Sequence, residues 1–317
     1  MVFIHKKGDS NDIKNYRPIT LTSTISKLFH SIINHRLCTY LSHNKYVDQT
    51  MQKGFQKGIK GCVEHSLVLS KLLDAIRKRR HSAHVIWLDI ANAFGSVPHS
   101  LVTLALESLH LPQWLTRYVT AFYHNIQVVG RTNHYLTDVI RVSRGVFQGD
   151  TLSPTIFVSL FNQILLYLRT EKQHGVSIKE EKISSLAFAD DLTLVCDNAR
   201  SAQRILNAVS SKLESNGLLI KPSKCYSLSL KSGCFDQSRK FSLNGVNFEN
   251  INNAPMKFLG LNIYNKHQKA NSSKYLQSKL STLLDQVDKR PIDTRTVQAR
   301  DIRWIHHFLP SLRPISM

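Results

Sequence analysis

The chain has 317 residues, of which 42% are hydrophobic and 20% are charged, and this apolar content argues against a disordered chain. Its length predicts two or three packed subdomains, because single cores rarely grow beyond roughly 250–300 residues. Lysine and arginine outnumber acids 42 to 22, and a formal charge of +20 favours a polyanionic partner. Nucleic acid is the first candidate for that partner, and an acidic membrane surface is the alternative.

The sequence shows no membrane-spanning or secretory segment. The longest apolar run, 156–168, contains Ser159, Asn162 and Gln163, and it is shorter than the ~20 apolar residues that a span needs. The cysteines form an odd set of 5 without a C-x-x-C pair. We therefore expect an intracellular protein, nuclear or cytoplasmic, with no membrane partner. Cys62 and His65 offer two zinc ligands, but no second pair is spaced to complete the site.

Two amphipathic helices are predicted near the start of the chain, over 24–41 and 63–79, from apolar residues at helical spacing. HVIWLDI at 84–90 predicts a strand, and Pro98 opens a helix that continues to Leu109. The apolar positions assigned to the first helix are Ile25, Leu28, Phe29, Ile32, Ile33 and Leu37.

The second half of the chain also alternates between predicted helices and predicted strands. Ser153 and Pro154 mark the start of a helix that contains the run 156–168. Short strands at 183–188 and 192–196 then predict a hairpin, and a helix over 199–216 follows it. An extended pattern resumes after Gly217, which ends that helix. The order strand, helix, helix, hairpin, helix, strand predicts an α+β fold with a ferredoxin-like antiparallel sheet and helices on one face.

Three acidic residues occupy unusual places in this pattern. Asp89 closes an apolar strand, and Asp190 and Asp191 lie at the tip of the predicted hairpin. Ionised carboxylates near a sheet interior are unfavourable unless they are paired or bound to metal, and clustered carboxylates repel each other. Converging acids are the natural ligands of Mg²⁺, and two such ions would support phosphoryl transfer. The alternative is a plain acidic turn, because aspartate is common in turns.

Seven segments, in order, resemble motifs of reverse transcriptases, most closely those of the non-LTR (LINE-type) retrotransposons. The resemblance covers residues 6 to about 264. WLDIANAF (87–94) is similar to the first catalytic motif, and AFADD (187–191) to the second catalytic hairpin. The other matching segments are KKGDSNDIKNYRPITLTSTISKLF (6–29), QKGF (52–55), SRGVFQGDTLSP (143–154), NGLLIKPSKC (216–225) and KFLGLNI (257–263), the last similar to the grip that meets the primer strand.

The resemblance implies a metal site for two Mg²⁺ ions, with Mn²⁺ as the alternative ion. Asp89 and Asp190 would be the main ligands, with Asp191 beside them and the carbonyl of Ile90 assisting. Lys224 would protonate the departing pyrophosphate.

The resemblance also implies how the incoming nucleotide is held. Phe94 would be a steric gate whose ring leaves no room for a ribose 2′-hydroxyl. Gln148 and Gly149 would line the nucleotide, glycine because a backbone must approach it closely. Lys6 and Arg17 would hold the triphosphate. Ordinary roles in the core, in a turn or on the surface are the alternatives at each position.

The resemblance further implies a right-hand polymerase. Residues 1–83 would form the first part of the fingers, 84–111 the first part of the palm and 112–144 a fingers insertion. Residues 145–264 would complete the palm, and 265–317 would begin a helical thumb that is incomplete.

The implied activity is synthesis of DNA on an RNA template, with an RNA template, a DNA primer and deoxynucleoside triphosphates as partners. A viral-type RNA polymerase is disfavoured by Phe94. An inactive retrotransposon fragment that only binds nucleic acid is the main alternative. Departures from the LINE-type pattern keep it open: Asn92 and Gly95 replace a lysine and an aspartate beside the gate, and His5 replaces a proline.

Overall fold

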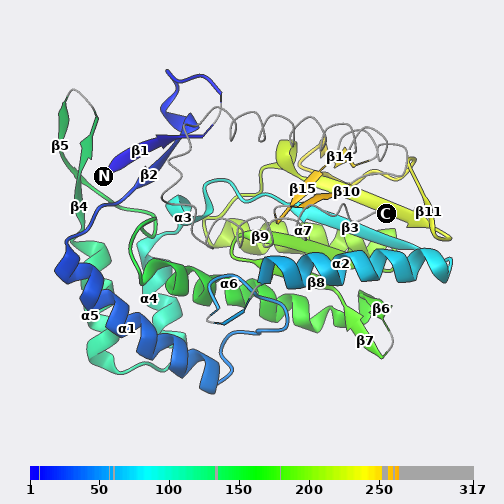
Figure 1. Ribbon diagram of the computed structural model, residues 1–317, viewed down its shortest axis with the longest axis horizontal. Helices are drawn as coiled ribbons and strands as arrows, with labels where there is room; N and C mark the ends of the chain where they lie inside the picture. Colours follow the sequence, from blue (N-terminus) through cyan, green and yellow to red (C-terminus); the bar gives the residue numbers. More distant parts are fainter. Residues whose placement is uncertain are drawn as a thin grey trace, which may run out of the picture.

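The computed structural model describes residues 1–251 and 256–263, apart from residues 7, 57, 60, 133–134, 179 and 260. The predicted start of the thumb, 265–317, lies outside the described residues. Figure 1 shows a layered molecule in which long helices flank a central sheet, with a separate small sheet near the N-terminus. None of the helices within the described ranges is both long and apolar enough to cross a bilayer.

The central sheet has the ferredoxin-like strand order. Strand β3 lies between β10 and β9, β8 is beyond β9, and each of these neighbouring pairs is antiparallel. Numbering these strands one to four along the chain gives the spatial order 4-1-3-2 that the sequence pattern predicts. The strands of this sheet are β3 (Ala83–Leu88), β8 (Ser185–Phe188), β9 (Asp191–Cys196), β10 (Tyr226–Lys231), β11 (Cys234–Phe235) and β14 (Glu249–Asn250).

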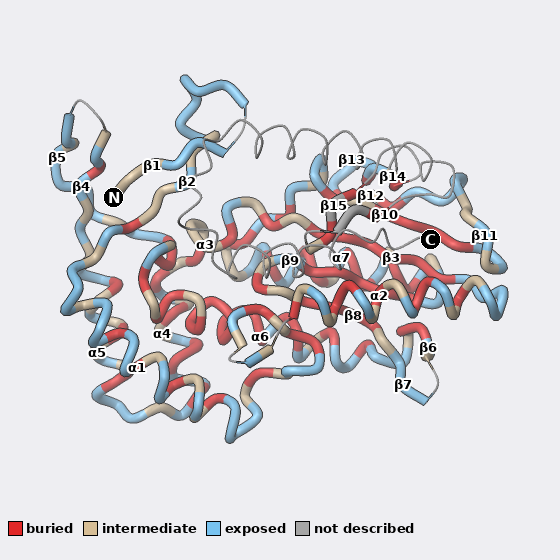
Figure 2. Tube along the Cα trace, in the orientation of Figure 1, coloured by how far each residue is buried: buried red, intermediate tan, exposed pale blue. Residues whose placement is uncertain are grey.

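One face of the sheet packs on the long helices α6 (Ser153–Thr170) and α7 (Ala199–Ser215). Side chains alternate across a strand, so Ile86 and Leu194 point into the same core as these helices. Helix α6 is buried on most sides, which explains why its sequence is apolar almost throughout. Figure 2 shows buried residues concentrated in α6 and the central strands.

The prediction that helices cover only one face of the sheet is wrong. Helix α2 (Gly61–Lys78) packs on the opposite face, where Leu72 and Leu73 join Val85 and Trp87 of β3 in a second core. Every residue of β3 is buried, and a strand buried on both sides needs cover on both faces.

A second, four-stranded sheet has the order β2-β1-β4-β5. Strand β1 pairs antiparallel with β2 and parallel with β4, through Val2 and Arg131. Helix α5 follows α4 and precedes β4. The elements of this part are β1 (Val2–His5), β2 (Tyr16–Ile19), α1 (Thr24–His43), α3 (Ala93–Ser96), α4 (His99–Ser108), α5 (Gln113–His124), β4 (Gln127–Arg131) and β5 (Leu136–Arg141).

Several short strands form small antiparallel ribbons. β15 and β16 make a hairpin in which Met256 pairs with Ile263. The ribbon strands are β6 (Val176–Ile178), β7 (Glu181–Ile183), β12 (Ser242–Leu243), β13 (Val246–Asn247), β15 (Met256–Phe258) and β16 (Leu261–Ile263).

Helix α1 differs from the sequence prediction in the face that it buries. It buries His30, Ile33, Leu37 and Leu41. Four of the apolar positions assigned to its packed face are exposed instead: Ile25, Leu28, Phe29 and Ile32. They recur at helical spacing, so they form an apolar stripe along the outer side of the helix.

Candidate active site

The three predicted acids lie at one end of two neighbouring strands. The register of β3 and β9 ends with Leu88 opposite Leu192, so Asp89 follows one strand where Asp191 begins the other. Asp191 pairs with Phe188 across the β8–β9 hairpin, and this pairing leaves Ala189 and Asp190 as a two-residue turn. The turn is therefore shorter by one residue than the sequence pattern predicted. The fold brings Asp89, about a hundred residues upstream, to the hairpin that carries the other two acids.

The acids influence one another electrostatically. Burial raises the pKa of Asp191 to about 6, and repulsion from Asp190 and then from Asp89 contributes to this rise. Part of the Asp191 residue is nevertheless exposed to solvent. Burial also raises the pKa of Asp190, with a further rise from Asp89. Burial raises the pKa of Asp89, whereas the neighbouring Lys224 and Lys221 lower it. The three carboxyl groups thus lie within electrostatic reach of one another, where a bound cation would favour their ionised forms.

An open cleft of about 510 Å³ contains two of these acids. The ammonium of Lys224 lies 3.9 Å from Oδ2 of Asp89 in this cleft, and both side chains are partly exposed to solvent. The β15–β16 hairpin forms another wall, and the Phe258 ring lies 6.4 Å from that of Trp87. The segment that resembles the primer grip therefore borders the same space as the acids.

The three acids have the oxygen ligands that a hard cation such as Mg²⁺ binds, but their side chains are not arranged around one point. Within the described ranges, no three His, Cys, Asp or Glu side chains already lie close enough together to hold an ion. Carboxylate oxygens are nevertheless the ligands that Mg²⁺ prefers. Burial first, and then repulsion between the acids, raises the pKa values of Asp190 and Asp191, and a bound cation would favour their ionised forms. Asp89, Asp190 and Asp191 therefore fit a divalent ion by donor type.

The backbone at Ile90 is oriented by the extended segment 219–221, which precedes β10. Ala91 N–H donates to the Leu219 carbonyl at 2.8 Å, and Lys221 N–H donates to the Asp89 carbonyl at 2.8 Å. In an antiparallel ladder the groups of successive residues point to opposite sides. The carbonyl of Ile90 therefore points away from this segment, toward the side of β3 on which β9 and the acidic turn lie.

The two residues predicted to hold the triphosphate, Lys6 and Arg17, lie on or next to the strands of the small sheet. Arg17 of β2 lies opposite Ile4 of β1, and Lys6 follows β1. Burial and the positive charges of Arg17 and Lys224 lower the pKa of Lys6, while Arg17 partly offsets the raised pKa of Asp190. Arg17 thus lies within electrostatic reach of Asp190 and Lys224 within reach of Asp89, while Lys6 lies within reach of both cations, although the sequence separates the three widely.

Phe94 lies in helix α3, which begins directly after the left-handed residue Asn92. Its ring stacks on Phe157 of α6 with centroids 4.3 Å apart, and the Phe55 ring meets it edge-on at 6.1 Å. The ring is half-buried and packs against the core, so Phe94 has a structural role in addition to any role toward a nucleotide.

Gln148 and Gly149 form a loop in contact with the end of β2. Thr20 N–H donates to the Gln148 carbonyl at 2.8 Å. Gly149 has φ +112°, and a Cβ at this position would lie 2.4 Å from the Thr20 carbonyl oxygen. Glycine is therefore required here for the packing of the loop itself. Among the residues that the structure describes, the buried Oε1 of Gln148 has no hydrogen-bond partner.

A buried cluster behind this loop was not predicted. Nδ1 of His30 lies 2.5 Å from Oδ1 of Asp150, and Nε2 of His30 lies 2.7 Å from the Tyr118 hydroxyl. Oδ2 of Asp150 accepts hydrogen bonds from Leu152 N–H at 3.1 Å and Ser153 N–H at 3.2 Å, which caps α6. The sequence signal was the acid directly after Gln148-Gly149, but its partner is 120 residues away.

The QKGF segment contacts the acidic turn directly. Gln52 is fully buried, and its amide binds the backbone of Ala189. His65 of α2 places Nε2 3.0 Å from the carbonyl oxygens of both Met51 and Ala187. That nitrogen is thus a hydrogen-bond donor to the backbone and is not free to bind a metal ion.

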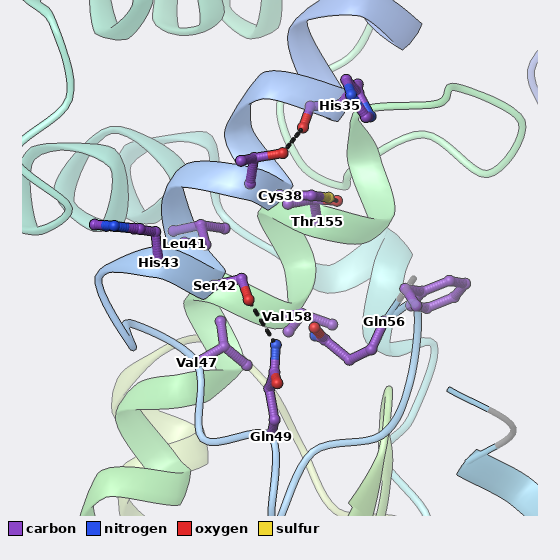
Figure 3. Close-up of a pocket in the computed structure, with 12 residues that line it drawn as sticks. His35, Cys38, Leu41, Ser42, His43, Val47, Gln49, Gln56, Thr155 and Val158 are labelled. Carbon is purple, nitrogen blue, oxygen red and sulfur yellow. Dashed lines mark hydrogen bonds between the residues drawn. The ribbon is translucent and has the colours of Figure 1, made fainter. Parts of the chain in front are cut away.

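A second cavity of about 390 Å³ lies between α1, α6 and the loop that precedes QKGF (Figure 3). None of the predicted site residues lines it, but Phe55 connects its wall to the Phe94 ring. Gln49 in this loop donates to the Ser42 hydroxyl at 3.1 Å.

Comparisons with known proteins agree with this geometry. The profile of the family described as reverse transcriptase (RNA-dependent DNA polymerase) matches residues 4–263. A Pol polyprotein of the type-1 retrotransposable element R2 from Popillia japonica is 32% identical over 242 residues, which is 75% of this chain and 33% of that protein. The corresponding R2DM polyprotein of Drosophila melanogaster is 26% identical over 230 residues, or 73% of this chain and 21% of that protein. This chain therefore spans a third or less of these relatives.

A solved structure shares the fold. An apo telomerase from Candida tropicalis, truncated from its C-terminal domain, has a TM-score of 0.50 at 11% identity over 71% of this chain and 44% of that one. The family profile covers most of the chain and the curated relatives are retrotransposon proteins, so this chain belongs to the reverse transcriptases of non-LTR retrotransposons.

Proposed function

We propose that this chain is the polymerase core of a retrotransposon reverse transcriptase, which synthesises DNA on an RNA template from a DNA primer and deoxynucleoside triphosphates. One observation carries the proposal: Asp89, Asp190 and Asp191 meet at one end of β3 and β9, with Lys224 beside them. Carboxylates and cations together are what transfer of a nucleotidyl group requires.

The acids and the Ile90 carbonyl hold Mg²⁺ in this proposal, with Mn²⁺ as an alternative. Two bound ions would stabilise the charge on the attacking and leaving oxygens. The primer 3′-hydroxyl loses its proton to solvent water and forms a bond to the α-phosphorus, while the bond from that phosphorus to pyrophosphate breaks. The Lys224 ammonium, 3.9 Å from Asp89, donates a proton to the pyrophosphate.

The surrounding side chains bind and select the nucleotide. Lys6 and Arg17 hold the triphosphate. Arg17 lies within electrostatic reach of Asp190, and Lys6 lies within reach of Arg17 and Lys224, which supports their position beside the reacting phosphates. Gln148, whose buried Oε1 has no hydrogen-bond partner among the described residues, binds the nucleotide together with Gly149. Phe94, held by its stacking on Phe157, blocks a ribose 2′-hydroxyl.

The two sheets support the proposed division into the parts of a right hand. The ferredoxin-like sheet of 84–111 and 145–264 is the palm. Residues 1–83 and 112–144 belong to the fingers, because β1 and β2 share a sheet with β4 and β5. The β15–β16 hairpin contacts the primer strand, since it borders the cleft that contains Asp89 and Asp191.

Primer extension tests the function and separates it from the main alternative. With a +20 charge, an inactive fragment would also bind nucleic acid, so binding alone does not discriminate. The purified chain, given an RNA template, a DNA primer, Mg²⁺ and deoxynucleotides, should extend the primer. Asp190→Asn should bind the same hybrid without extending it. A wild-type chain that binds hybrid but does not extend it, with either Mg²⁺ or Mn²⁺, would support the inactive alternative.

A further inference from the structure

The turn that carries Asp190 contains a backbone conformation that its residue does not favour. Ala189 has φ +55°, in the left-handed region where a Cβ is disfavoured and glycine is the usual residue. The turn has only two residues, and Asp190 is the other. Left-handed conformations of this kind persist only where the surroundings hold them.

The side chain of Gln52 binds the backbone of Ala189 through both ends of its amide. Oε1 of Gln52 accepts the N–H of Ala189 at 2.8 Å, and Nε2 of Gln52 donates to the Ala189 carbonyl at 3.2 Å. The same Oε1 accepts the N–H of Gly54 at 2.8 Å, which orients the amide. Gln52 is fully buried, so water does not compete for these bonds.

Both peptide groups that flank the Ala189 Cα are therefore fixed. The Ala189 carbonyl belongs to the peptide that leads into Asp190, and its direction determines where the Asp190 side chain projects. The segment that carries Gln52 is itself anchored to β8, because Ala187 N–H donates to Met51 at 2.8 Å and Lys53 N–H donates to Ala187 at 2.9 Å. A Cβ at Gly54 would lie 2.3 Å from Ala189 N, so glycine is needed for the close approach.

We propose that Gln52 is a positioning residue for catalysis: its amide holds Ala189 in the left-handed conformation and so aims the Asp190 carboxylate. The expected effect of Gln52 on the reaction rate rests on the proposed function. The contact between Gln52 and Ala189 is tested separately, by a measurement that does not depend on enzyme activity.

Four variants test the inference. Gln52→Met keeps the volume and removes the hydrogen bonds, whereas Gln52→Glu keeps the acceptor for Ala189 N–H and loses the donor. Ala189→Gly removes the penalty of the left-handed conformation, so the turn should form without help from Gln52. Gln49→Met is the matched control, because Gln49 lies in the same loop but binds Ser42.

In primer extension, Gln52→Met should lower kcat by about tenfold and raise the Mg²⁺ concentration for half-maximal rate by a similar factor. The KM for deoxynucleotide should change by less than about twofold, since the nucleotide contacts are on other elements. Gln52→Glu should fall between wild type and Gln52→Met. Ala189→Gly should be close to wild type alone, and should recover most of the loss when combined with Gln52→Met.

The inference is wrong if Gln52→Met matches Gln49→Met in kcat and in Mg²⁺ requirement, or if Ala189→Gly recovers nothing in the folded double variant. If Gln52→Met does not fold, Gln52→Glu with and without Ala189→Gly gives the same comparison.

Hydrogen exchange separates this inference from the proposed function. The Ala189 amide should exchange faster in Gln52→Met, while the Ala187 amide, bound to Met51, stays protected. A wild-type chain without polymerase activity would refute the proposed function and leave this contact in place. An unchanged Ala189 amide in an active enzyme would refute the positioning role alone.

Discussion

His30 and Asp150 form a buried pair, with Nδ1 of His30 2.5 Å from Oδ1 of Asp150 and neither side chain exposed to solvent. The pair joins α1 to the first turn of α6 directly behind Gly149, and Tyr118 of α5 completes the chain of contacts. The loop proposed to bind the nucleotide is thus anchored to three helices.

Asp150→Ala should lower the free energy of unfolding by about 3–5 kcal/mol, the usual effect of leaving one member of a buried pair without its partner. It also leaves the N–H groups of Leu152 and Ser153 without their acceptor. Urea denaturation measures the change. Asp138→Ala removes an exposed acid and should stay within about 0.5 kcal/mol of wild type. A similar small effect for Asp150→Ala would show that the pair contributes little to stability.

The acidic cluster should make the metal-free chain less stable as pH rises from 4 to 7. The folded pKa of Asp191 is raised to about 6, so the folded state holds this proton where the unfolded state has lost it. Stability therefore falls as pH rises through this window. Mg²⁺ should raise the melting temperature at pH 7, where the acids are ionised, and should have little effect near pH 4.

Asp191→Asn is the control for that pH profile, because it removes the charge while keeping the shape. In the absence of metal, the variant should be more stable than wild type at pH 7 and equally stable near pH 4. Melting curves at both pH values, with and without Mg²⁺, make the comparison. Equal stability of the two proteins at every pH would contradict the charge repulsion inferred at this site.

Asn92 and Gly95, the two departures beside Phe94, should be coupled. A Cβ at Gly95 would lie 2.3 Å from Nδ2 of Asn92, which is itself left-handed at φ +46°. Gly95→Ala should therefore cost about 1–3 kcal/mol through overpacking. Asn92→Gly accepts the same backbone and removes the clash, so the double variant should recover most of that loss in urea denaturation. If the two substitutions instead change the free energy of unfolding additively, Asn92 and Gly95 are not coupled.

Local sequence patterns predicted most elements of the central sheet and its helices. Ser153-Pro154 does begin α6, and Gly217 follows the end of α7. Strand β3 and the hairpin of β8 and β9 lie within a few residues of the predicted ranges. These elements have strong apolar periodicity and clear terminal residues, and such signals depend only on near neighbours.

Features that depend on distant partners were missed. Strand β1 pairs with β4 through Val2 and Arg131, and no local pattern encodes that pairing. Likewise, periodicity could not show which apolar side of α1 finds a partner, and Ile25 is 82% exposed. At the site, the three acids stood out from their places at the strand ends and from motif resemblance, whereas the contact of Gln52 with Ala189 required the folded chain.

Phe94 is the position that should determine the choice of sugar. Its ring stacks on Phe157 at 4.3 Å, so it cannot easily move aside for a 2′-hydroxyl. Phe94→Val should open that space and reduce discrimination against ribonucleotides by about 10- to 100-fold, or roughly 1–3 kcal/mol. Competing ribo- and deoxynucleotides in primer extension give the ratio directly. Asp190→Asn, in contrast, should abolish incorporation of both sugars. Phe157→Leu leaves the gate ring present but removes its stacking partner, so it should lower stability and relax the discrimination less than Phe94→Val does. If Phe94→Val retains the wild-type preference while extending primers, Phe94 is a packing residue, and the argument against an RNA-synthesising polymerase loses its basis.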